Sequence, residues 1–68
     1  MLRITLKAAR VNAGYSQKSA AKALRISNKT LSRWESGESF PNVEKIKLIC
    51  ELYKITYDEL IFLPRNLL

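Results

Sequence analysis

The 68-residue sequence lacks histidine altogether and contains a single cysteine, Cys50. Without histidine the chain has no Cys/His pair and no Ser/His/Asp triad, and one cysteine forms no disulfide within the chain. A lone cysteine among apolar neighbours behaves as a small core residue. The chain is also too short for a deep pocket and has no clustered pair of carboxylates. We therefore expect no enzymatic activity, no metal or other cofactor, and no small-molecule ligand.

Long apolar runs and a signal peptide are also missing. An apolar run such as residues 60–63 is far shorter than the roughly 20 residues that span a bilayer, and nothing at the N-terminus resembles a secretion signal. A cytoplasmic protein without membrane contact is expected. Glycine and proline are scarce, with two of each, and no strand-like alternation is present. The expected fold is one small all-α domain over residues 1–68.

Positive charge is plentiful and unevenly distributed. Twelve Lys and Arg residues oppose six Asp and Glu residues, for a net charge of +6. Residues 1–37 hold eight basic residues and one acidic residue, a net +7, whereas residues 38–68 hold four basic and five acidic residues, a net −1. Such asymmetry predicts a surface that binds a polyanion. A generally solvated basic surface is the alternative.

Residues suited to helix N-caps precede four apolar-patterned segments. These residues are Thr5, Ser16, Ser27 and Asn42. Helices are expected at about 6–13, 17–24, 28–36 and 43–53, with glycine just past the first and third. The capping box over residues 56–59 opens a short fifth helix that Pro64 stops. The tail, residues 64–68, is expected to be frayed or to contact a dimer partner.

Helical spacing assigns faces to these segments. Leu6, Arg10 and Ala13 share one face, so Arg10 points towards the core and needs a partner for its charge. In the fourth helix a core-facing stripe is expected. Its residues are Val43, Ile46, Ile49, Cys50 and Tyr53.

The second and third helices, with the short turn between them, form a candidate helix-turn-helix over about residues 16–36. Leu31 and Trp34, assisted by Ile26, are expected to pack against the body. That leaves an outward-facing patch of Asn28, Lys29, Ser32 and Arg33. Lys and Arg donate to guanine O6 and N7, and Asn pairs with adenine, so the patch predicts reading of bases. The alternatives are a solvated basic face and, for Asn28, bonding to the helix's own first turn.

The order and spacing of short motifs from Leu6 to Leu60 resemble the phage repressor/Cro-type helix-turn-helix family. The matching residues are Arg10, Gly14, Ser16-Gln17, Ala21, Leu24-x-Ile26-Ser27, Leu31-Ser32-x-Trp34-Glu35-x-Gly37, Pro41-Asn42-Val43 and Ile55-Thr56-x-Asp58-Glu59-Leu60. The resemblance implies a compact five-helix lambda-repressor-like DNA-binding domain whose third helix lies in the major groove.

The resemblance also implies roles for individual residues. Base contacts fall to Asn28, Lys29 and Arg33, with Ser32 near bases or the sugar-phosphate. Phosphate contacts fall to Ser16, Gln17, Ser27 and Asn42, together with backbone amides near Asn42. A structural ion pair is implied between Arg10 and Glu35.

The chain departs from the family's pattern at two positions, because Arg25 and Lys54 stand where the family usually has glycine. If the backbone there is left-handed, each residue costs roughly 1–2 kcal/mol. Otherwise the turn geometry shifts, and with it the tilt of the third helix.

Two functions follow from these observations. The first is a sequence-specific regulator of transcription, a repressor, that binds double-stranded DNA as a homodimer at an inverted-repeat operator. Its setting is a bacterial or phage-encoded system, and the chain is either complete or the DNA-binding part of a longer repressor. The second is a protein-interaction module such as an antitoxin or accessory phage factor. Candidate dimer contacts, unless they complete the monomer core, are Tyr57, Leu60, Ile61, Phe62, Leu67 and Leu68.

Overall fold

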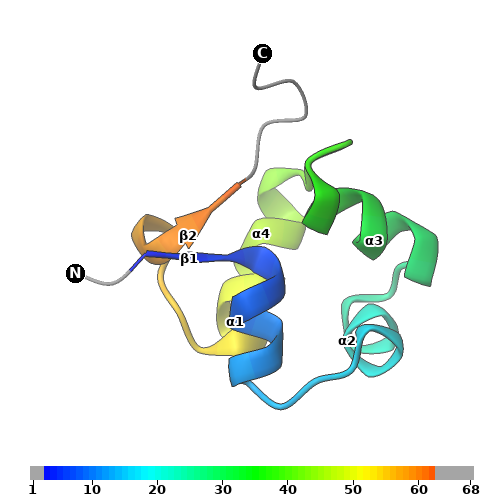
Figure 1. The fold of residues 1–68 in the computed structure, drawn as a ribbon, viewed down its shortest axis with the longest axis horizontal. Coiled ribbons are helices and arrows are strands. Elements are labelled where there is room, and N and C mark those ends of the chain that lie inside the picture. The colour runs from blue at the N-terminus through cyan, green and yellow to red at the C-terminus, as the bar shows by residue number, and fades with distance from the viewer. Residues whose placement is uncertain (1–2, 63–68) are drawn as a thin grey trace.

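The computed structural model describes residues 3–62, which form four α-helices, one short 3-10 helix and two short strands (Figure 1). In chain order they are β1 (Ile4–Thr5), α1 (Leu6–Asn12), α2 (Gln17–Leu24), α3 (Asn28–Ser36), α4 (Val43–Tyr53), η1 (Tyr57–Glu59) and β2 (Leu60–Ile61). The strand pair lies on one side of α1, and α2 and α3 lie on the other (Figure 1). None of the helices in residues 3–62 has the length and apolar character that a membrane crossing requires.

The four α-helices begin at the predicted N-caps. The side chain of each cap accepts a hydrogen bond from the backbone N–H three residues later, over 2.9–3.1 Å. Each such bond satisfies one of the first-turn N–H groups that have no partner within the helix. The predicted bounds of α2, α3 and α4 are confirmed, and α1 ends one residue before the predicted Ala13.

The predicted fifth α-helix is wrong. Its capping box forms, with the Thr56 N–H donating to Glu59 Oε1 over 2.9 Å, but the chain then makes a single 3-10 turn. Residues 60–61 are extended and pair in parallel with β1, Ile4 opposite Leu60. Strands of two residues are too short to show an alternating pattern. Long-range backbone pairing and burial of Leu60 prevail over the local helix signal.

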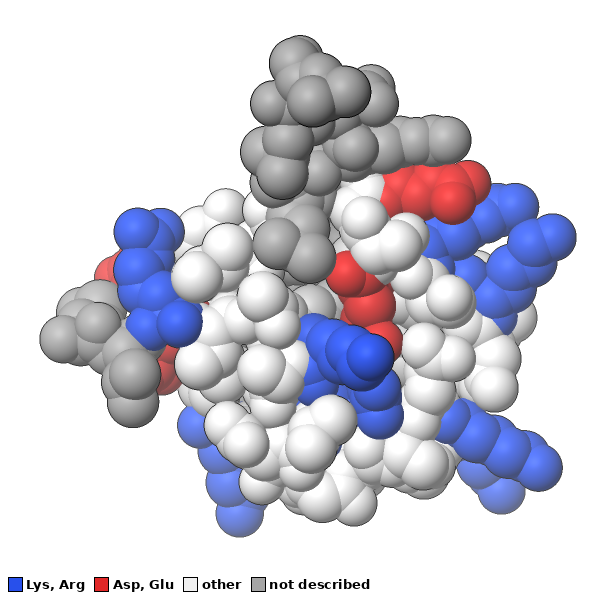
Figure 2. Space-filling view, in the orientation of Figure 1, with Lys and Arg blue, Asp and Glu red and all other residues white. Residues whose placement is uncertain are grey.

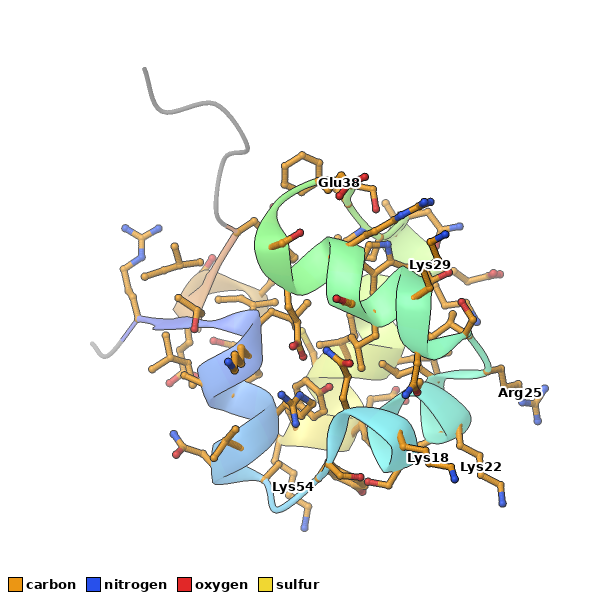
Figure 3. All side chains as sticks on the ribbon, turned by 45° about the vertical axis from the view of Figure 1, so that its right-hand side comes forward. Lys18, Lys22, Arg25, Lys29, Glu38 and Lys54 are labelled. Atoms are coloured by element: carbon orange, nitrogen blue, oxygen red, sulfur yellow. The ribbon has the colours of Figure 1, made fainter. Side chains whose placement is uncertain are left out.

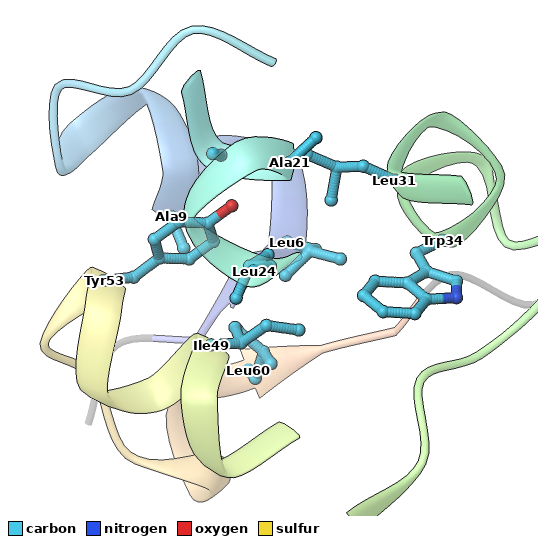
Figure 4. Packing of buried hydrophobic residues seen from close by; sticks show 10 residues of the cluster. Leu6, Ala9, Ala21, Leu24, Leu31, Trp34, Ile49, Tyr53 and Leu60 are labelled. Atoms are coloured by element: carbon cyan, nitrogen blue, oxygen red, sulfur yellow. The ribbon is translucent and has the colours of Figure 1, made fainter. Parts of the chain in front are cut away.

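The hydrophobic core lies where the helices and the strand pair meet (Figure 4). Leu31 is fully buried and Trp34 is 7% exposed, so both hold α3 against the body as predicted. The small side chains of Ala20 and Ala21 are buried as well, which lets α2 and α3 pack closely. The buried hydrophobic residues are Leu6, Ala9, Ala20, Ala21, Leu24, Leu31, Trp34, Ile49, Tyr53 and Leu60.

The predicted stripe on α4 is only partly correct. Ile49 and Tyr53 are buried and Ile46 and Cys50 are half-buried, but Val43 is 70% exposed. Val43 is the first residue of α4, and its side chain remains largely in solvent. The first turn of α4 therefore presents apolar surface to solvent.

Arg25 and Lys54 both adopt the left-handed conformation, with φ/ψ of 60°/45° and 56°/50°. They are the C-caps of α2 and α4. The helix-turn-helix therefore keeps a left-handed turn although the residue there is not glycine. The turn is also fixed from outside, because Lys45 Nζ on α4 donates to the carbonyl oxygen of Leu24 over 2.8 Å. That bond occupies one of the last carbonyls of α2.

Replacing Arg25 with glycine is expected to raise the free energy of unfolding by about 1 kcal/mol. The left-handed backbone costs an L-residue roughly 1–2 kcal/mol, and the larger entropy loss of glycine offsets about half of that gain. The melting temperature should rise by about 4–8 °C. Lys54→Gly is the matched variant at the equivalent cap. If the melting temperature rises in neither variant, backbone strain at these caps is refuted.

Candidate nucleic-acid interface

Lys and Arg side chains gather along the edge of the molecule formed by α2 and α3 (Figure 2). In Figure 3, Lys18 and Lys22 of α2, Arg25 of the turn and Lys29 of α3 all extend from this side. All four residues are exposed. Four of the eight basic residues of the first half of the sequence thus lie on one side of the molecule, which we call the basic edge (Lys18, Lys22, Arg25 and Lys29).

The four residues predicted to contact bases are all exposed on α3. They are Asn28, Lys29, Ser32 and Arg33. Leu31 and Trp34 of the same helix are buried, so the outer face of α3 is polar while its inner face is held in the core. We call these four residues the α3 strip.

Arg33 already has a partner at the end of the α3 strip. Its Nε lies 3.7 Å from Glu38 Oε2, and the two side chains are 48% and 45% exposed. Exposed ion pairs of this kind contribute about 0.2–1 kcal/mol. Arg33 can therefore exchange its ion pair with Glu38 for a hydrogen bond to a different acceptor at little cost.

A polar groove of about 520 Å³ opens between α1, α2 and α3. Its lining residues are Lys7, Arg10, Ser16, Gln17, Ser32, Glu35 and Ser36. The groove brings two predicted phosphate contacts, Ser16 and Gln17, beside Ser32 of the α3 strip. It also contains Lys7, an exposed cation that is not among the contacts predicted from the sequence. The sequence does contain a signal for this position of Lys7, because a residue three before Arg10 on the same helix lies on the same side of that helix.

Three predicted phosphate contacts are exposed N-cap residues, Ser16, Ser27 and Asn42. Their side-chain oxygens are engaged by backbone N–H groups of their own helices. Ser16 also shares a reciprocal capping box with Ser19, whose Oγ accepts from the Ser16 N–H over 3.0 Å. The remaining first-turn N–H groups give each of these helix ends partial positive charge.

Beneath the groove, a buried ion pair ties α1 to α3. Arg10 Nε donates to Glu35 Oε2 over 2.7 Å, and the two side chains are only 9% and 6% exposed. Arg10 Nη1 also donates to the carbonyl oxygen of Tyr15 over 2.9 Å. Gln17 Nε2 donates to Glu35 Oε1 over 3.2 Å. The pair that the resemblance implied is thus present, and one carboxylate connects three helices.

Tyr53 lies beside this network, with its ring centroid 6.0 Å from that of Tyr15. Its hydroxyl is buried and has no hydrogen-bond partner among the described residues. Burial, reinforced by the negative charge of Glu35, raises the pKa of Tyr53 from 10.0 to about 12, although Arg10 acts in the opposite direction. The hydroxyl therefore stays protonated well above neutral pH.

Replacing Tyr53 with phenylalanine is expected to leave stability at neutral pH unchanged or higher, because an unpaired buried polar group costs about 1–3 kcal/mol. The raised pKa means that the folded state holds this proton more tightly than the unfolded state. In the wild type, the stability that comes from this tighter proton binding is fully present below pH 10.0 and is lost as the pH rises towards about 12. In denaturant titrations across this pH range, the free energy of unfolding should fall less steeply with pH in Tyr53→Phe than in the wild type. An unchanged or steeper loss would contradict the buried hydroxyl.

The predicted dimer contacts have different environments. Tyr57 is 59% exposed, and Ile61 and Phe62 are half-buried. Leu60 is only 5% exposed and completes the monomer core, which is the alternative left open for these residues, so its assignment to a dimer contact is wrong. Leu67 and Leu68 lie outside the described residues.

Comparisons with known proteins match the same region. A family model described as Helix-turn-helix matches residues 6–60. The HTH-type transcriptional activator BcrR of Enterococcus faecalis is 36% identical over 56 residues, which are 82% of this chain and 28% of that protein. The HTH-type transcriptional regulator ImmR of Bacillus subtilis (strain 168) is 39% identical over 56 residues, 82% of this chain and 44% of that protein. This chain therefore spans less than half the length of either relative. No solved structure matches this chain with statistical significance.

Proposed function

The chain belongs to the helix-turn-helix family, of the phage repressor/Cro type, and from this premise we propose that it binds double-stranded DNA and regulates transcription. The observation that carries the proposal is the α3 strip. Its polar and basic side chains are exposed along one face, Leu31 and Trp34 anchor the opposite face in the core, and the basic edge adjoins it. A helix of this kind can enter the major groove without unfolding any part of the domain.

Sequence is read by the α3 strip in this proposal. Lys29 and Arg33 donate to guanine O6 and N7, and Asn28 makes paired hydrogen bonds with adenine. Ser32 lies at the edge of the polar groove and contacts a base or the sugar-phosphate. Arg33 gives up its exposed contact with Glu38 when it engages DNA.

Affinity comes from contacts with phosphates. Ser16, Gln17, Ser27 and Asn42 supply them together with the exposed N–H groups of their helix ends. To these we add Lys7, because it lines the same groove as Ser16 and Gln17. Each neutralised phosphate makes binding steeper in salt, by about 0.9 in the slope of log K against log salt concentration.

We further propose that the protein is a repressor that acts as a homodimer on an inverted repeat in a bacterial or phage-encoded system. Repression requires only that the operator be occupied, whereas activation requires an additional contact with the transcription machinery. Both relatives described above are bacterial, and one of them is named an activator. Half-sites about 34–36 Å apart, one turn of DNA, are expected for a dimer.

The decisive experiment is selection of bound sequences from a randomised duplex library near physiological salt, followed by sequencing. Enrichment of an inverted repeat with half-sites one helical turn apart is the expected result. Enrichment of a single half-site would retain sequence-specific binding but reject the dimeric operator. No enrichment would reject the proposal and favour the protein-interaction alternative.

Replacing Glu38 with glutamine is expected to tighten DNA binding about two- to fivefold. The ion pair between Glu38 and Arg33 competes with DNA, and removing an interaction worth roughly 0.5–1 kcal/mol changes the binding constant by this factor. The change releases Arg33 and removes a negative charge from the end of the α3 strip. Fluorescence anisotropy with the selected duplex measures the effect. Glu51→Gln, an exposed position on α4, is the control with the same charge change. Equal effects of the two variants would assign the gain to net charge alone.

A further inference from the structure

A half-buried lysine joins α4 to the turn of the helix-turn-helix. Lys45 lies in the first turn of α4, and its Nζ donates to the carbonyl oxygen of Leu24, the last residue of α2, over 2.8 Å. It lines a groove of about 610 Å³ between the end of α2 and α4, which Glu44 and Glu51 also line. Among the described residues, its ammonium is bonded to the carbonyl and to neither of these carboxylates. Its contact is thus with the backbone of the turn.

We propose that Lys45 is a positioning residue for DNA reading, which holds the α3 strip in the orientation that the bases require. The inference rests on the proposed function, since it concerns how the same α3 strip reaches DNA. Lys45 itself contacts no base in this arrangement, because its ammonium is occupied by the Leu24 carbonyl. It acts through the turn at residues 25–27, which leads from α2 into α3.

The bonded carbonyl belongs to the peptide group that leads into Arg25. A peptide group is planar, so contacts with its oxygen and with its N–H fix the plane from both sides. Lys45 holds the oxygen, and the Arg25 N–H donates to the carbonyl oxygen of Lys22 over 3.1 Å. The next backbone rotation is the left-handed φ of Arg25, at 60°. That conformation is unfavourable for an L-residue, so the turn keeps it because the surrounding contacts hold it there.

The turn controls the first residues of α3 more than the later ones. Leu31 and Trp34 are buried, and they hold the rest of the helix directly in the core. Asn28 and Lys29 precede both of these residues and follow the turn, so their placement depends on the turn. A tilt that moves them by about 1 Å exceeds the range of roughly 0.5 Å over which hydrogen-bond lengths vary. Loss of the Lys45 contact should therefore weaken base preference first where Asn28 and Lys29 read.

The same lysine connects the turn to a proposed phosphate contact. Its backbone N–H donates to Oδ1 of Asn42, the N-cap of α4, over 2.9 Å. Since α4 packs against both α1 and α2, its start is a fixed part of the body. When Asn42 and the N–H groups beside it bind a phosphate, Lys45 links that phosphate to the turn through one residue. A domain anchored on the DNA backbone at α4 thus presents the start of α3 in one orientation.

The test compares Lys45→Met with Lys47→Met. Methionine keeps an unbranched side chain and removes the ammonium. Lys47 is exposed on the same helix and lines the same groove, so its substitution makes the same charge change while the bond to Leu24 is kept. Lys45 is half-buried and outside the hydrophobic core, so Lys45→Met should fold, which circular dichroism checks.

Anisotropy titrations measure binding of both variants to the selected operator and to random duplex over a range of salt. We expect Lys45→Met to weaken operator binding by about 5- to 50-fold, the loss of one or two base contacts. Binding to random duplex should fall by less than about twofold, and the salt slope should not change, because the phosphate contacts remain. Lys47→Met should match the wild type on the operator to within about twofold.

Three results would overturn the inference. An equal loss on operator and random duplex, with a salt slope lower by about 0.9, would make Lys45 a direct phosphate contact. A lower melting temperature with unchanged operator binding would make its role purely structural. Equal effects of Lys45→Met and Lys47→Met would assign the loss to net charge.

Hydrogen exchange separates this inference from the proposed function, because it needs no DNA. The N–H groups of Arg25 and Ile26 donate to carbonyl oxygens of α2 over 3.0–3.1 Å. Both should exchange about tenfold faster in Lys45→Met than in the wild type or Lys47→Met. Unchanged exchange would overturn the hold of Lys45 on the turn even if the protein binds its operator. If exchange behaves as expected but the wild type selects no duplex sequence, the proposed function fails, and with it the role of Lys45 in DNA reading.

Discussion

Replacing Glu35 with alanine is expected to destabilise the protein by about 3–5 kcal/mol, because it leaves the buried Arg10 cation without its partner. The two side chains are 9% and 6% exposed, so water compensates little of the loss. Gln17 loses an acceptor at the same time. A domain of this size has a total stability of roughly 3–10 kcal/mol, so thermal melts should fall by more than about 10 °C or show no folded baseline.

Glu44→Ala is the control for this prediction. Glu44 is an exposed carboxylate in the first turn of α4, and its removal should cost only about 0.3–1 kcal/mol of interaction with the helix dipole. Comparable melting temperatures for the two variants would argue against a buried ion pair. The double variant Arg10→Met with Glu35→Leu should be more stable than Glu35→Ala, because an apolar pair leaves no uncompensated charge. It keeps the prediction testable if Glu35→Ala does not fold.

Replacing Lys29 or Arg33 with alanine is expected to weaken binding to the selected operator by about 1–3 kcal/mol, or roughly 5- to 150-fold. The affinity should fall only for DNA that carries the preferred base at the position read by that residue, and the preference for that base should weaken. Both side chains are exposed, so neither change should alter the melting temperature substantially. Anisotropy titrations with the operator and with single-base variants of it measure the effect.

Lys54→Ala is the matched control because it removes the same charge as Lys29→Ala. Figure 3 shows Lys54 well away from Lys29. Its loss should change operator binding little. If Lys29→Ala weakened binding to the operator and to random DNA by the same factor, and lowered the salt slope by about one, Lys29 would be a phosphate contact instead of a base contact.

The helical part of the domain could be predicted from local chemistry. Thr5, Ser16, Ser27 and Asn42 marked the four helix starts because an N-cap side chain bonds to a backbone N–H only three residues away. Gly37 marked the end of α3 because glycine accepts the left-handed conformation, found there at φ 86°. Capping interactions of this kind involve residues only a few positions apart, so they can be predicted from a single sequence.

The α3 strip was visible for the same reason. Once Leu31 and Trp34 are assigned to the core, helical periodicity determines that Asn28, Lys29, Ser32 and Arg33 face outward. The partner of Arg10 came from the family resemblance, since nothing local connects positions 10 and 35. Burial of Arg10 could be deduced from its face, but the contact with Gln17 could not.

The sequence by itself thus determined the four α-helices, the outward face of α3 and the charge that these helices carry. Tertiary structure decided the rest: the pairing of Ile4 with Leu60, the exposure of Val43, and the groove that brings Lys7 beside Ser16. Each of these depends on residues far apart in the chain, and their local preferences are too weak to encode the outcome. Burial of apolar area and pairing of backbone groups across the whole domain settle such choices.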